Sequence, residues 1–149
     1  MRVISYNVNG IRAAIKKGFV EWLSENPADI ICLQETKASK EDVDTTEIEK
    51  LGYACYWYSA QKKGYSGVAI FTKIKPDNVV YGTGIEQSDF EGRVIQADFG
   101  PVSIVNAYFP SGTSGDERQN YKYQWLSEFE QYLGALRKKK TATHCSRGL

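Results

Sequence analysis

The sequence predicts one α/β domain in which a parallel or mixed β-sheet is covered by helices. Residues 2–34 fit a strand, a helical region and a second strand in turn. Apolar residues form one stripe along a predicted helix over residues 121–137. A chain of 149 residues that is 42% hydrophobic and 25% charged is long enough to bury roughly 68–70% of its unfolded surface.

The composition narrows the class of protein. No apolar run approaches the ~18 residues of a membrane span, and Met1-Arg2-Val3 leads directly into a strand-like pattern, so we expect no secretory signal. The three cysteines share no metal-binding spacing and their odd number disfavours a disulfide framework, which indicates a reduced, cytoplasmic setting. A net charge of +1 does not exclude nucleic-acid binding, because that depends on a local basic patch.

The remaining elements follow from the periodicity and the breaking residues. Asn26-Pro27 stops the first helical region, and Ser39-Lys40-Glu41-Asp42 is a capping-box-like start for an exposed helix to about Lys50. Pro110 to Gln119 is a Gly/Ser-rich loop. Strands are expected at residues 2–6, 30–33, 53–59, 67–71, 78–81, 93–99 and 102–108.

The stretch from Ile30 to Leu33 is the centre of the predicted sheet. Four apolar residues in a row indicate a strand buried on both faces, and the polar run Gln34-Glu35-Thr36-Lys37 follows at once. Ligands of open α/β sheets lie just beyond the carboxyl ends of the strands. Glu35 is therefore placed where it could meet a metal ion or a reacting group. The alternative is a solvated glutamate at a strand end.

Two further strand ends carry polar residues: Asn7 and Asn9 after the first strand, and Asn106, Tyr108 and Ser111 at a later one. A carboxylate with amide oxygens is a hard-oxygen environment that suits Mg²⁺ or Mn²⁺ rather than zinc. The phenol of Tyr108 could lie against a phosphate. Alternatively, the two asparagines only cap the following helix, and the tyrosine is a core residue with a polar end.

A second set of residues suggests contacts with phosphate groups. Gly64-Tyr65-Ser66-Gly67 can bring the backbone close to a bulky ligand. Lys62, Lys63 and Arg93 could contact phosphates. The alternative is that the two lysines belong to a solvated hairpin connection.

Five motifs occur in order along the chain: Tyr6-Asn7-Val8-Asn9-Gly10-Ile11-Arg12, Leu33-Gln34-Glu35-Thr36-Lys37, Gly64-Tyr65-Ser66-Gly67-Val68-Ala69, Glu91-Gly92-Arg93 and Asn106-Ala107-Tyr108-Phe109-Pro110. Together they closely resemble exodeoxyribonuclease III and the related AP endonucleases of the endonuclease/exonuclease/phosphatase superfamily. The resemblance extends from residue 1 to about Lys139. The Gly-Tyr-Ser-Gly-Val and Glu-Gly-Arg motifs favour the DNA-repair branch over the lipid phosphatases of the superfamily.

The resemblance implies a four-layer α/β sandwich, of which this chain is the N-terminal half. It implies metal-dependent phosphodiester hydrolysis at abasic sites and 3′ ends of duplex DNA, as in base-excision repair. The implied cofactor is Mg²⁺ or Mn²⁺, and the implied partner is double-stranded DNA. Neither a membrane nor an obligate protein partner is implied.

The same resemblance implies a role for individual residues. Glu35 is expected to ligate the metal, and Asn7 to help hold it or to orient a carboxylate. Tyr108 is expected to contact the scissile phosphate. Lys37, Tyr65 and Arg93 are expected to lie near the metal or the DNA backbone. Lys62 and Lys63 of the basic connection are predicted to contact DNA as well.

The end of the chain departs from the family pattern. A Gly-Asp-(Tyr/Phe)-Asn strand end, a later Asp and a terminal Ser-Asp-His are not found, and the surroundings of His144 do not match the family histidine. We therefore divide the chain into a partial domain over residues 1–140 and an aberrant tail over 141–149. The tail is interpreted as frameshifted, with a disordered tail on a short protein as the alternative.

Two consequences are expected for a chain of this length. One sheet would lack the partner it packs against and would expose an apolar face, which favours association or aggregation. The chain would also be inactive, so that a non-catalytic DNA-binding fragment is the main alternative function. Another phosphodiesterase of the superfamily is a further alternative.

The frameshift hypothesis predicts the nucleotide sequence. Read one nucleotide later, a His codon followed by Cys gives only Ile or Thr, and Cys followed by Ser gives Val or Ala. The shifted frame can then spell Ile-Val-Val-Gly-Asp-Tyr, the strand that the family resemblance calls for. Sequencing the DNA beyond codon 139 checks this, and the hypothesis fails if no single-base shift restores that strand.

Overall fold

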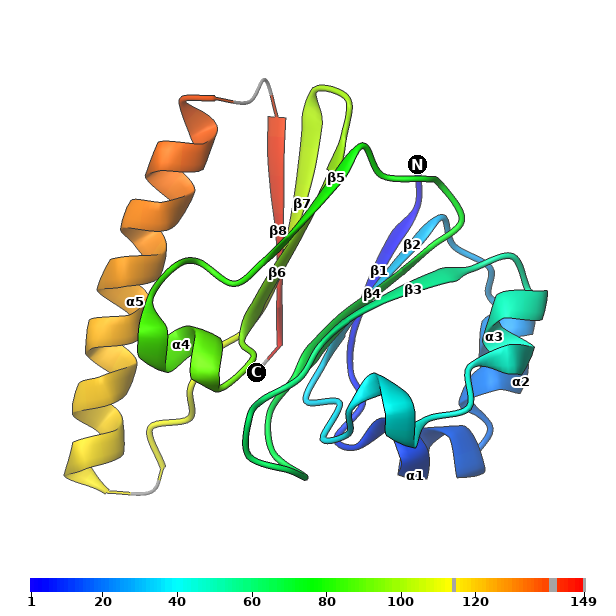
Figure 1. Ribbon diagram of the computed structural model, residues 1–149, viewed down its shortest axis with the longest axis horizontal. Helices are drawn as coiled ribbons and strands as arrows, with labels where there is room; N and C mark the ends of the chain where they lie inside the picture. The colour runs from blue at the N-terminus through cyan, green and yellow to red at the C-terminus, as the bar shows by residue number, and fades with distance from the viewer. Residues whose placement is uncertain (114, 140–141, 149) are drawn as a thin grey trace.

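The computed structural model describes residues 1–113, 115–139 and 142–148, the last of these as backbone only. Two four-stranded sheets face each other, and helices lie on the outer side of each sheet (Figure 1). The strands are β1 Val3–Asn7, β2 Ile30–Gln34, β3 Ala54–Tyr58, β4 Val68–Thr72, β5 Asn78–Tyr81, β6 Val94–Phe99, β7 Val102–Tyr108 and β8 Ala142–Gly148. The helices are α1 Ile11–Lys16, α2 Phe19–Glu25, a 3₁₀ turn at Lys40–Asp42, α3 Thr46–Lys50, α4 Glu86–Phe90 and α5 Asp116–Arg137.

Both sheets are mixed. The first has the order β1-β2-β4-β3, with β1 parallel to β2 and the other neighbours antiparallel. The second has the order β5-β6-β7-β8, with only β7 and β8 parallel. The expectation of an α/β fold with a mixed sheet covered by helices is confirmed.

Strand β2 shows how the sequence builds the layers. Successive side chains of a strand point to opposite faces. Ile31 and Leu33 belong to the hydrophobic core under α1, α2 and α3, whereas Ile30 and Cys32 belong to the core between the two sheets. All five residues of β2 are buried, as its unbroken apolar run predicts.

The two sheets cover each other. Side chains of β2 and β4 pack against Ile95, Ala97 and Ile104 of the second sheet. A third core lies between the second sheet and α5 and includes Trp125 and Phe129. The expectation that one sheet would lack its packing partner is therefore wrong, because the described chain contains strands of both sheets.

A polar contact crosses the core between the sheets. Asn106 of β7 is fully buried, and its Nδ2 donates to the carbonyl oxygens of Leu33 (2.9 Å) and Ala69 (2.8 Å). Its Oδ1 accepts a hydrogen bond from Nε2 of Gln34 at 2.8 Å. One side chain of the second sheet is thus bonded to both central strands of the first.

Three local predictions differ from the structure. The helix expected over residues 39–50 is split, because Val43 is extended and Asp44 accepts the Thr46 N–H, so that a new helix begins there. Helix α4 was not predicted. The backbone of residues 142–148 forms β8 beside β7, a strand where the sequence pattern indicated an irregular tail; the frameshift itself stays a prediction.

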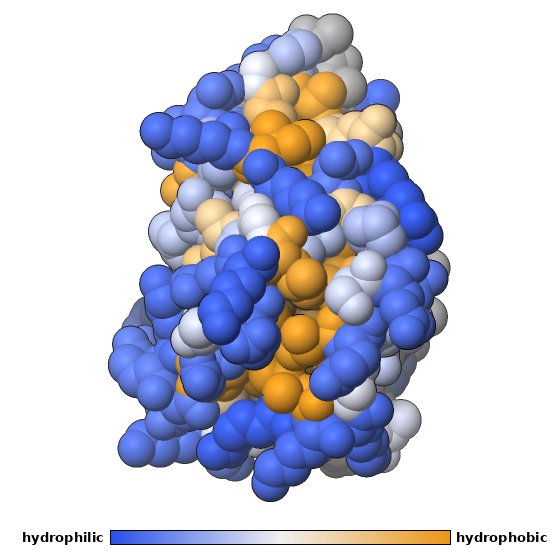
Figure 2. Space-filling model, turned by 90° about the vertical axis from the view of Figure 1, so that its right-hand side faces the viewer, coloured by the Kyte–Doolittle hydropathy of each residue, from blue (hydrophilic) through white to orange (hydrophobic). Residues whose placement is uncertain are grey.

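The helical layer over the first sheet is thin. Figure 2 shows this side of the molecule, where hydrophobic side chains form a stripe between hydrophilic margins. The helices of this layer have five to seven residues, and the sheet side chains beneath them, such as Ile31, Leu33 and Phe71, are fully buried. Among the residues that the structure describes, none of the helices has the length and apolar character needed to cross a membrane.

The cross-sheet contact predicts a stability defect. Asn106→Leu keeps the approximate volume but removes a hydrogen-bond partner from two buried carbonyl groups and from the Gln34 amide. We expect the free energy of unfolding to fall by about 2–4 kcal/mol, measured by urea denaturation. Asn78→Leu, at an exposed position at the start of β5, is the matched control. Equal denaturation midpoints for the two variants would contradict this role of Asn106.

Candidate active site

Three loops meet at one end of the sandwich. The loop after β2 lies between the loop after β1 and the loop before β4. Four backbone hydrogen bonds join them: Gly10 N to Glu35 O (2.8 Å), Ile11 N to Thr36 O (2.9 Å), Thr36 N to Gly67 O (3.2 Å) and Lys37 N to Ser66 O (2.9 Å). The predicted strand-end residues are therefore brought together by the backbone.

These loops contain the strained backbone of the protein. In the described part of the chain, all the non-glycine residues with positive φ lie here: Asn9, Glu35, Lys37 and Ser66. Such conformations persist only where the surroundings impose them, and they gather at functional sites. Gly67 also has positive φ, and a Cβ there would lie 2.4 Å from Oγ1 of Thr36. The loops can approach this closely only because residue 67 is glycine.

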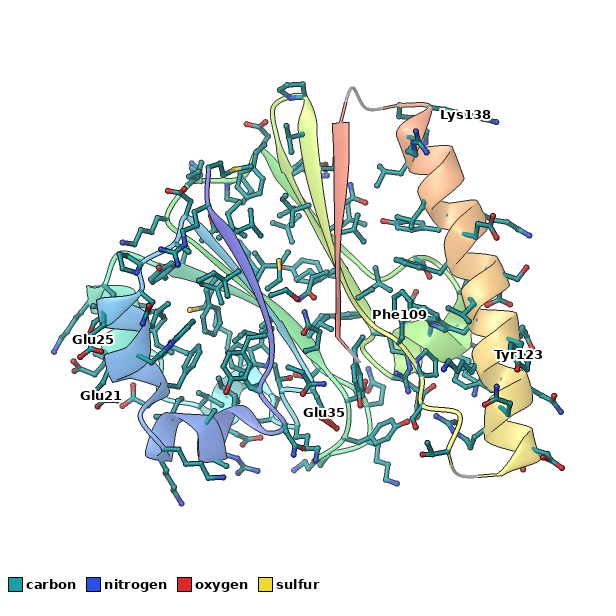
Figure 3. All side chains as sticks on the ribbon, turned by 180° about the vertical axis from the view of Figure 1, so that it is seen from behind. Glu21, Glu25, Glu35, Phe109, Tyr123 and Lys138 are labelled. Carbon is teal, nitrogen blue, oxygen red and sulfur yellow. The ribbon has the colours of Figure 1, made fainter. Side chains whose placement is uncertain are left out.

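Glu35 lies just beyond the end of β2 (Figure 3). Tyr108, the last residue of β7, meets it there. The Tyr108 hydroxyl donates to Oε1 of Glu35 at 3.1 Å, and Nζ of Lys37 lies 3.8 Å from the same oxygen. The Glu35 side chain is 21% exposed, so a ligand can reach it. Burial, and next the charge of Glu35, raise the pKa of Tyr108 to about 12, so the phenol is neutral near pH 7.

Asn7 lies next to this pair. It ends β1 opposite Gln34 in the parallel register, one residue before Glu35. Its Oδ1 accepts the N–H of Asn9 at 3.0 Å, and Oδ1 of Asn9 accepts a hydrogen bond from Nζ of Lys37 at 2.8 Å. The predicted helix-capping role for these asparagines does not hold for α1, which has no side-chain cap at its start.

The oxygen atoms of Glu35 and Asn7, at the end of the sandwich where the three loops meet, supply part of a coordination shell for a hard divalent cation. The donors are the carboxylate of Glu35 and the amide oxygen of Asn7. Mg²⁺ commonly takes one or two carboxylates and completes its shell with water and substrate phosphate. Within residues 1–113, 115–139 and 142–148, no group of three or more His, Cys, Asp or Glu residues could hold a metal.

Arg93 was predicted to contact DNA, but the structure places it in the interior. Only 1% of its surface is exposed. Its guanidinium donates to the Tyr108 carbonyl (3.0 Å) and the Tyr65 hydroxyl (3.0 Å), and forms an ion pair with Glu91 (3.2 Å). With its donors directed at protein groups, Arg93 is positioned to orient Tyr65 and Tyr108 rather than to meet a phosphate.

Glu91 is the acceptor at the centre of this cluster. It accepts from the Tyr65 hydroxyl at 2.7 Å, and Arg118 lies 3.7 Å from the same oxygen. Burial alone would raise the pKa of Glu91, but hydrogen bonds from neighbouring tyrosines and from Arg93 outweigh it and hold that pKa below its usual range. Sequence reasoning did not identify Glu91 or Arg118 as site residues.

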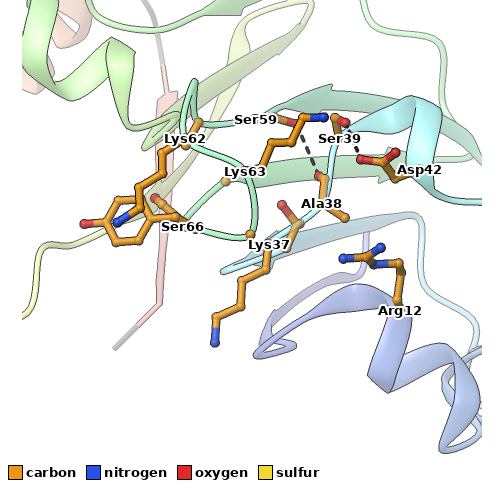
Figure 4. A pocket seen from close by; sticks show the side chains of 14 residues that line it. Arg12, Lys37, Ala38, Ser39, Asp42, Ser59, Lys62, Lys63 and Ser66 are labelled. Atoms are coloured by element: carbon orange, nitrogen blue, oxygen red, sulfur yellow. Dashed lines mark hydrogen bonds between the residues drawn. The ribbon is translucent and has the colours of Figure 1, made fainter.

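A basic pocket of about 280 Å³ lies beside the Glu35 rim (Figure 4). Its cationic side chains are Arg12 from α1, Lys37 from the loop after β2, and Lys62 and Lys63 from the connection between β3 and β4. Asp42 is the one acidic residue among its lining residues. The pocket brings together four of the five residues predicted to contact DNA, Lys37, Lys62, Lys63 and Tyr65, and adds Arg12, for which the sequence predicted no role.

Of the other residues singled out in the sequence, Tyr65 lies in the basic pocket and Ser111 in the loop after β7. Tyr65 lines the basic pocket and carries the ammonium of Lys62 at 5.5 Å from its ring centre. Ser111 shares a hydrogen bond with Thr113 in the loop after β7. In the described part of the molecule no hydrogen bond joins Ser111 to Glu35. The side chain of His144 lies outside the described residues.

The Glu35–Tyr108 contact predicts a measurable titration. In the fold the phenol keeps its proton up to a pKa of about 12, against 10.0 for an ordinary tyrosine. The resulting stabilisation is complete below pH 10.0 and is lost as the pH rises through about 12. Glu35→Gln should lower this pKa toward the ordinary value, because the charge that opposes the phenolate is removed.

Ultraviolet absorbance of tyrosinate during alkaline titration measures this shift. The Tyr108→Phe variant identifies the component that belongs to Tyr108. Glu25→Gln, on the outer helix α2, is the control and should leave the titration unchanged. An identical Tyr108 titration in the Glu35→Gln and unsubstituted proteins would contradict the contact.

Comparison with known proteins places the chain in a family. The Endonuclease/Exonuclease/phosphatase family matches residues 4–143. An exodeoxyribonuclease of Bacillus subtilis is 44% identical over 146 residues, 97% of this chain and 57% of that protein. The DNA repair nuclease APEX1 of Danio rerio is 40% identical over 147 residues, 97% of this chain and 47% of that protein. The chain thus spans about half the length of these relatives.

Solved structures show the same fold. The 3′-5′ exonuclease NExo of Neisseria meningitidis superposes with a TM-score of 0.87 at 26% identity, covering 99% of this chain and 57% of that one. An AP endonuclease of Archaeoglobus fulgidus gives 0.78 at 33% identity, covering 89% and 51%. Within the family, the relatives and structures it resembles are of the exonuclease III and AP endonuclease type. The family match, these relatives and the shared fold together show that the chain belongs to the Endonuclease/Exonuclease/phosphatase family.

Proposed function

We propose that this chain supplies the metal-and-phosphate half of a site for Mg²⁺-dependent hydrolysis of DNA phosphodiesters, as in base-excision repair. The observation that carries the proposal is the Glu35–Tyr108 contact beside a pocket with four cationic side chains. A carboxylate next to a neutral phenol suits a metal and a phosphate, and the pocket suits the adjoining backbone of a polyanion.

Each residue has a part in this reaction. Glu35, with Asn7, would hold Mg²⁺ or Mn²⁺; such an ion, when bound, neutralises charge that develops on the phosphate. Tyr108, whose raised pKa keeps it protonated, would turn its one O–H from Glu35 to a phosphate oxygen when substrate and metal are bound. The Arg93 guanidinium donates a hydrogen bond to the backbone carbonyl of Tyr108 and so holds this residue in place. The phenol and the carboxylate are thus oriented before substrate arrives.

The basic pocket is the proposed contact with duplex DNA. Lys37, Lys62 and Lys63 would each lie near a phosphate, and Tyr65 would place its ring beside the backbone. A related 3′ phosphatase of Neisseria has been solved with a product DNA hairpin, which supports a DNA strand as the ligand. These contacts give affinity without sequence preference, because phosphates carry no base information.

A chain that supplies only the metal-and-phosphate half of the site is expected to bind DNA without hydrolysing it. The family motif with its Asp and Asn, which would position or deprotonate the attacking water, does not occur in this sequence. A non-catalytic DNA-binding fragment is therefore the second candidate function, and the basic pocket is the observation that favours it.

Incubation of the 149-residue chain with an abasic-site duplex and Mg²⁺ distinguishes the two. We expect salt-sensitive binding by fluorescence anisotropy and no appreciable cleavage on a denaturing gel. Cleavage that is lost in Glu35→Ala would instead show a complete catalytic site. Failure to bind the duplex at low salt would contradict the proposed DNA contact.

A frame-corrected, full-length protein tests the role of Glu35 in the same assay. Glu35→Ala should lose activity chiefly through weaker use of the metal, so its defect should be larger at limiting than at saturating Mg²⁺. Glu25→Ala, on the outer helix, is the control. An unchanged rate of Glu35→Ala at limiting Mg²⁺ would contradict metal ligation by this residue.

A further inference from the structure

A second pocket adjoins the basic pocket and has a different character. Its volume is about 430 Å³, and it shares Lys62 and Tyr65 with the basic pocket. Its other lining residues are Gln87, Phe90, Glu91 and Arg118. A ligand strand lying along the basic pocket would therefore pass directly into this second one.

Phe90 is the feature of this pocket that the fold does not explain. Its side chain is 55% exposed although it is a large hydrophobic residue. Its backbone is nevertheless fixed, because its carbonyl accepts the Gln61 N–H at 2.9 Å. The preceding Asp89 accepts the N–H groups of Thr83 and Gly84, both at 2.9 Å. The aromatic ring is thus presented to solvent from a rigid support.

Cationic groups stand beside the ring. The Arg118 guanidinium lies over the Tyr121 ring at 4.9 Å and donates to the Tyr65 hydroxyl at 3.1 Å. The Lys62 ammonium lies over the Tyr65 ring, 5.5 Å from its centre. An exposed aromatic ring that shares a pocket with two cationic side chains is the kind of arrangement by which proteins bind unpaired bases together with their phosphates.

We infer that this pocket binds an unpaired nucleobase, stacked on Phe90, with Lys62 and Arg118 at the adjoining phosphates. The Gln87 side chain has both a donor and an acceptor and lies within the same pocket, where it can meet the edge of the base. The inference rests on the proposed DNA contact and deepens it, since it names the substrate class: DNA with an unpaired segment next to the duplex.

Binding of two labelled DNAs by the 149-residue chain tests the inference. One is a blunt duplex, and the other is the same duplex with a short single-stranded overhang that contains 2-aminopurine, prepared with each strand polarity. We expect one polarity of the overhang to bind about fivefold to a hundredfold more tightly than the blunt duplex, as stacking of one base would give. Stacking should also quench the 2-aminopurine fluorescence.

Three variants locate the effect. Phe90→Ala should remove the overhang advantage and the quenching while the blunt duplex still binds, and Phe90→Trp should retain both. Tyr81→Ala, at another exposed aromatic residue on the edge strand β5, should change neither.

The possible failures are distinguishable. If neither DNA binds, the proposed DNA contact fails and this inference fails with it. If the blunt duplex binds but the overhang gives no advantage, or if Phe90→Ala weakens both DNAs equally, only the base pocket is overturned. The latter result would indicate that Phe90 serves the fold or the contact with the duplex.

Discussion

The hydrogen bond between Gln34 and Asn106 is the constraint on which the site depends. These residues belong to different sheets, and each lies close to a site residue along the chain: Glu35 directly follows Gln34, and Tyr108 lies two positions after Asn106. A sheet-to-sheet core made only of aliphatic side chains tolerates small slips, because dispersion and burial have little direction. A directional bond within the core removes this freedom. The contact between Gln34 and Asn106 thus helps to hold the two sheets at the distance at which the Tyr108 hydroxyl donates to Glu35.

Much of the fold could be predicted from the sequence because its signals are local. The unbroken apolar run from Ile30 to Leu33 predicts a central strand. Helix α4 could not be found in this way, since it has only five residues and ends on an exposed Phe90. The helix expected from Ser39 was wrong because Asp44 begins a separate helix. Strand β8 could not be predicted either. It forms by pairing with β7, and no residue pattern in the segment itself reveals this long-range interaction.

The site was predictable to a similar degree. Glu35, Asn7 and Tyr108 stand at strand ends, and parallel or mixed pairing brings strand ends together. The sequence prediction put Arg93 at the DNA-contacting surface, because arginine is almost never fully buried unless it is paired. In the structure it is paired and buried. Its partner Glu91 lies two residues earlier in the same motif. Opposite charges separated by one glycine were the available signal for a buried ion pair.

The basic pocket has a consequence for how the protein meets its ligand. The chain is close to neutral, with a net charge of +1, yet Arg12 and three lysines share one concave surface. Positive charge at this surface must be balanced by negative charge elsewhere on the molecule, so the protein carries a permanent charge asymmetry. In the field of a polyanion such a molecule experiences a torque as well as an attraction. Diffusing encounters would then be pre-aligned, with the pocket facing the strand before any contact forms.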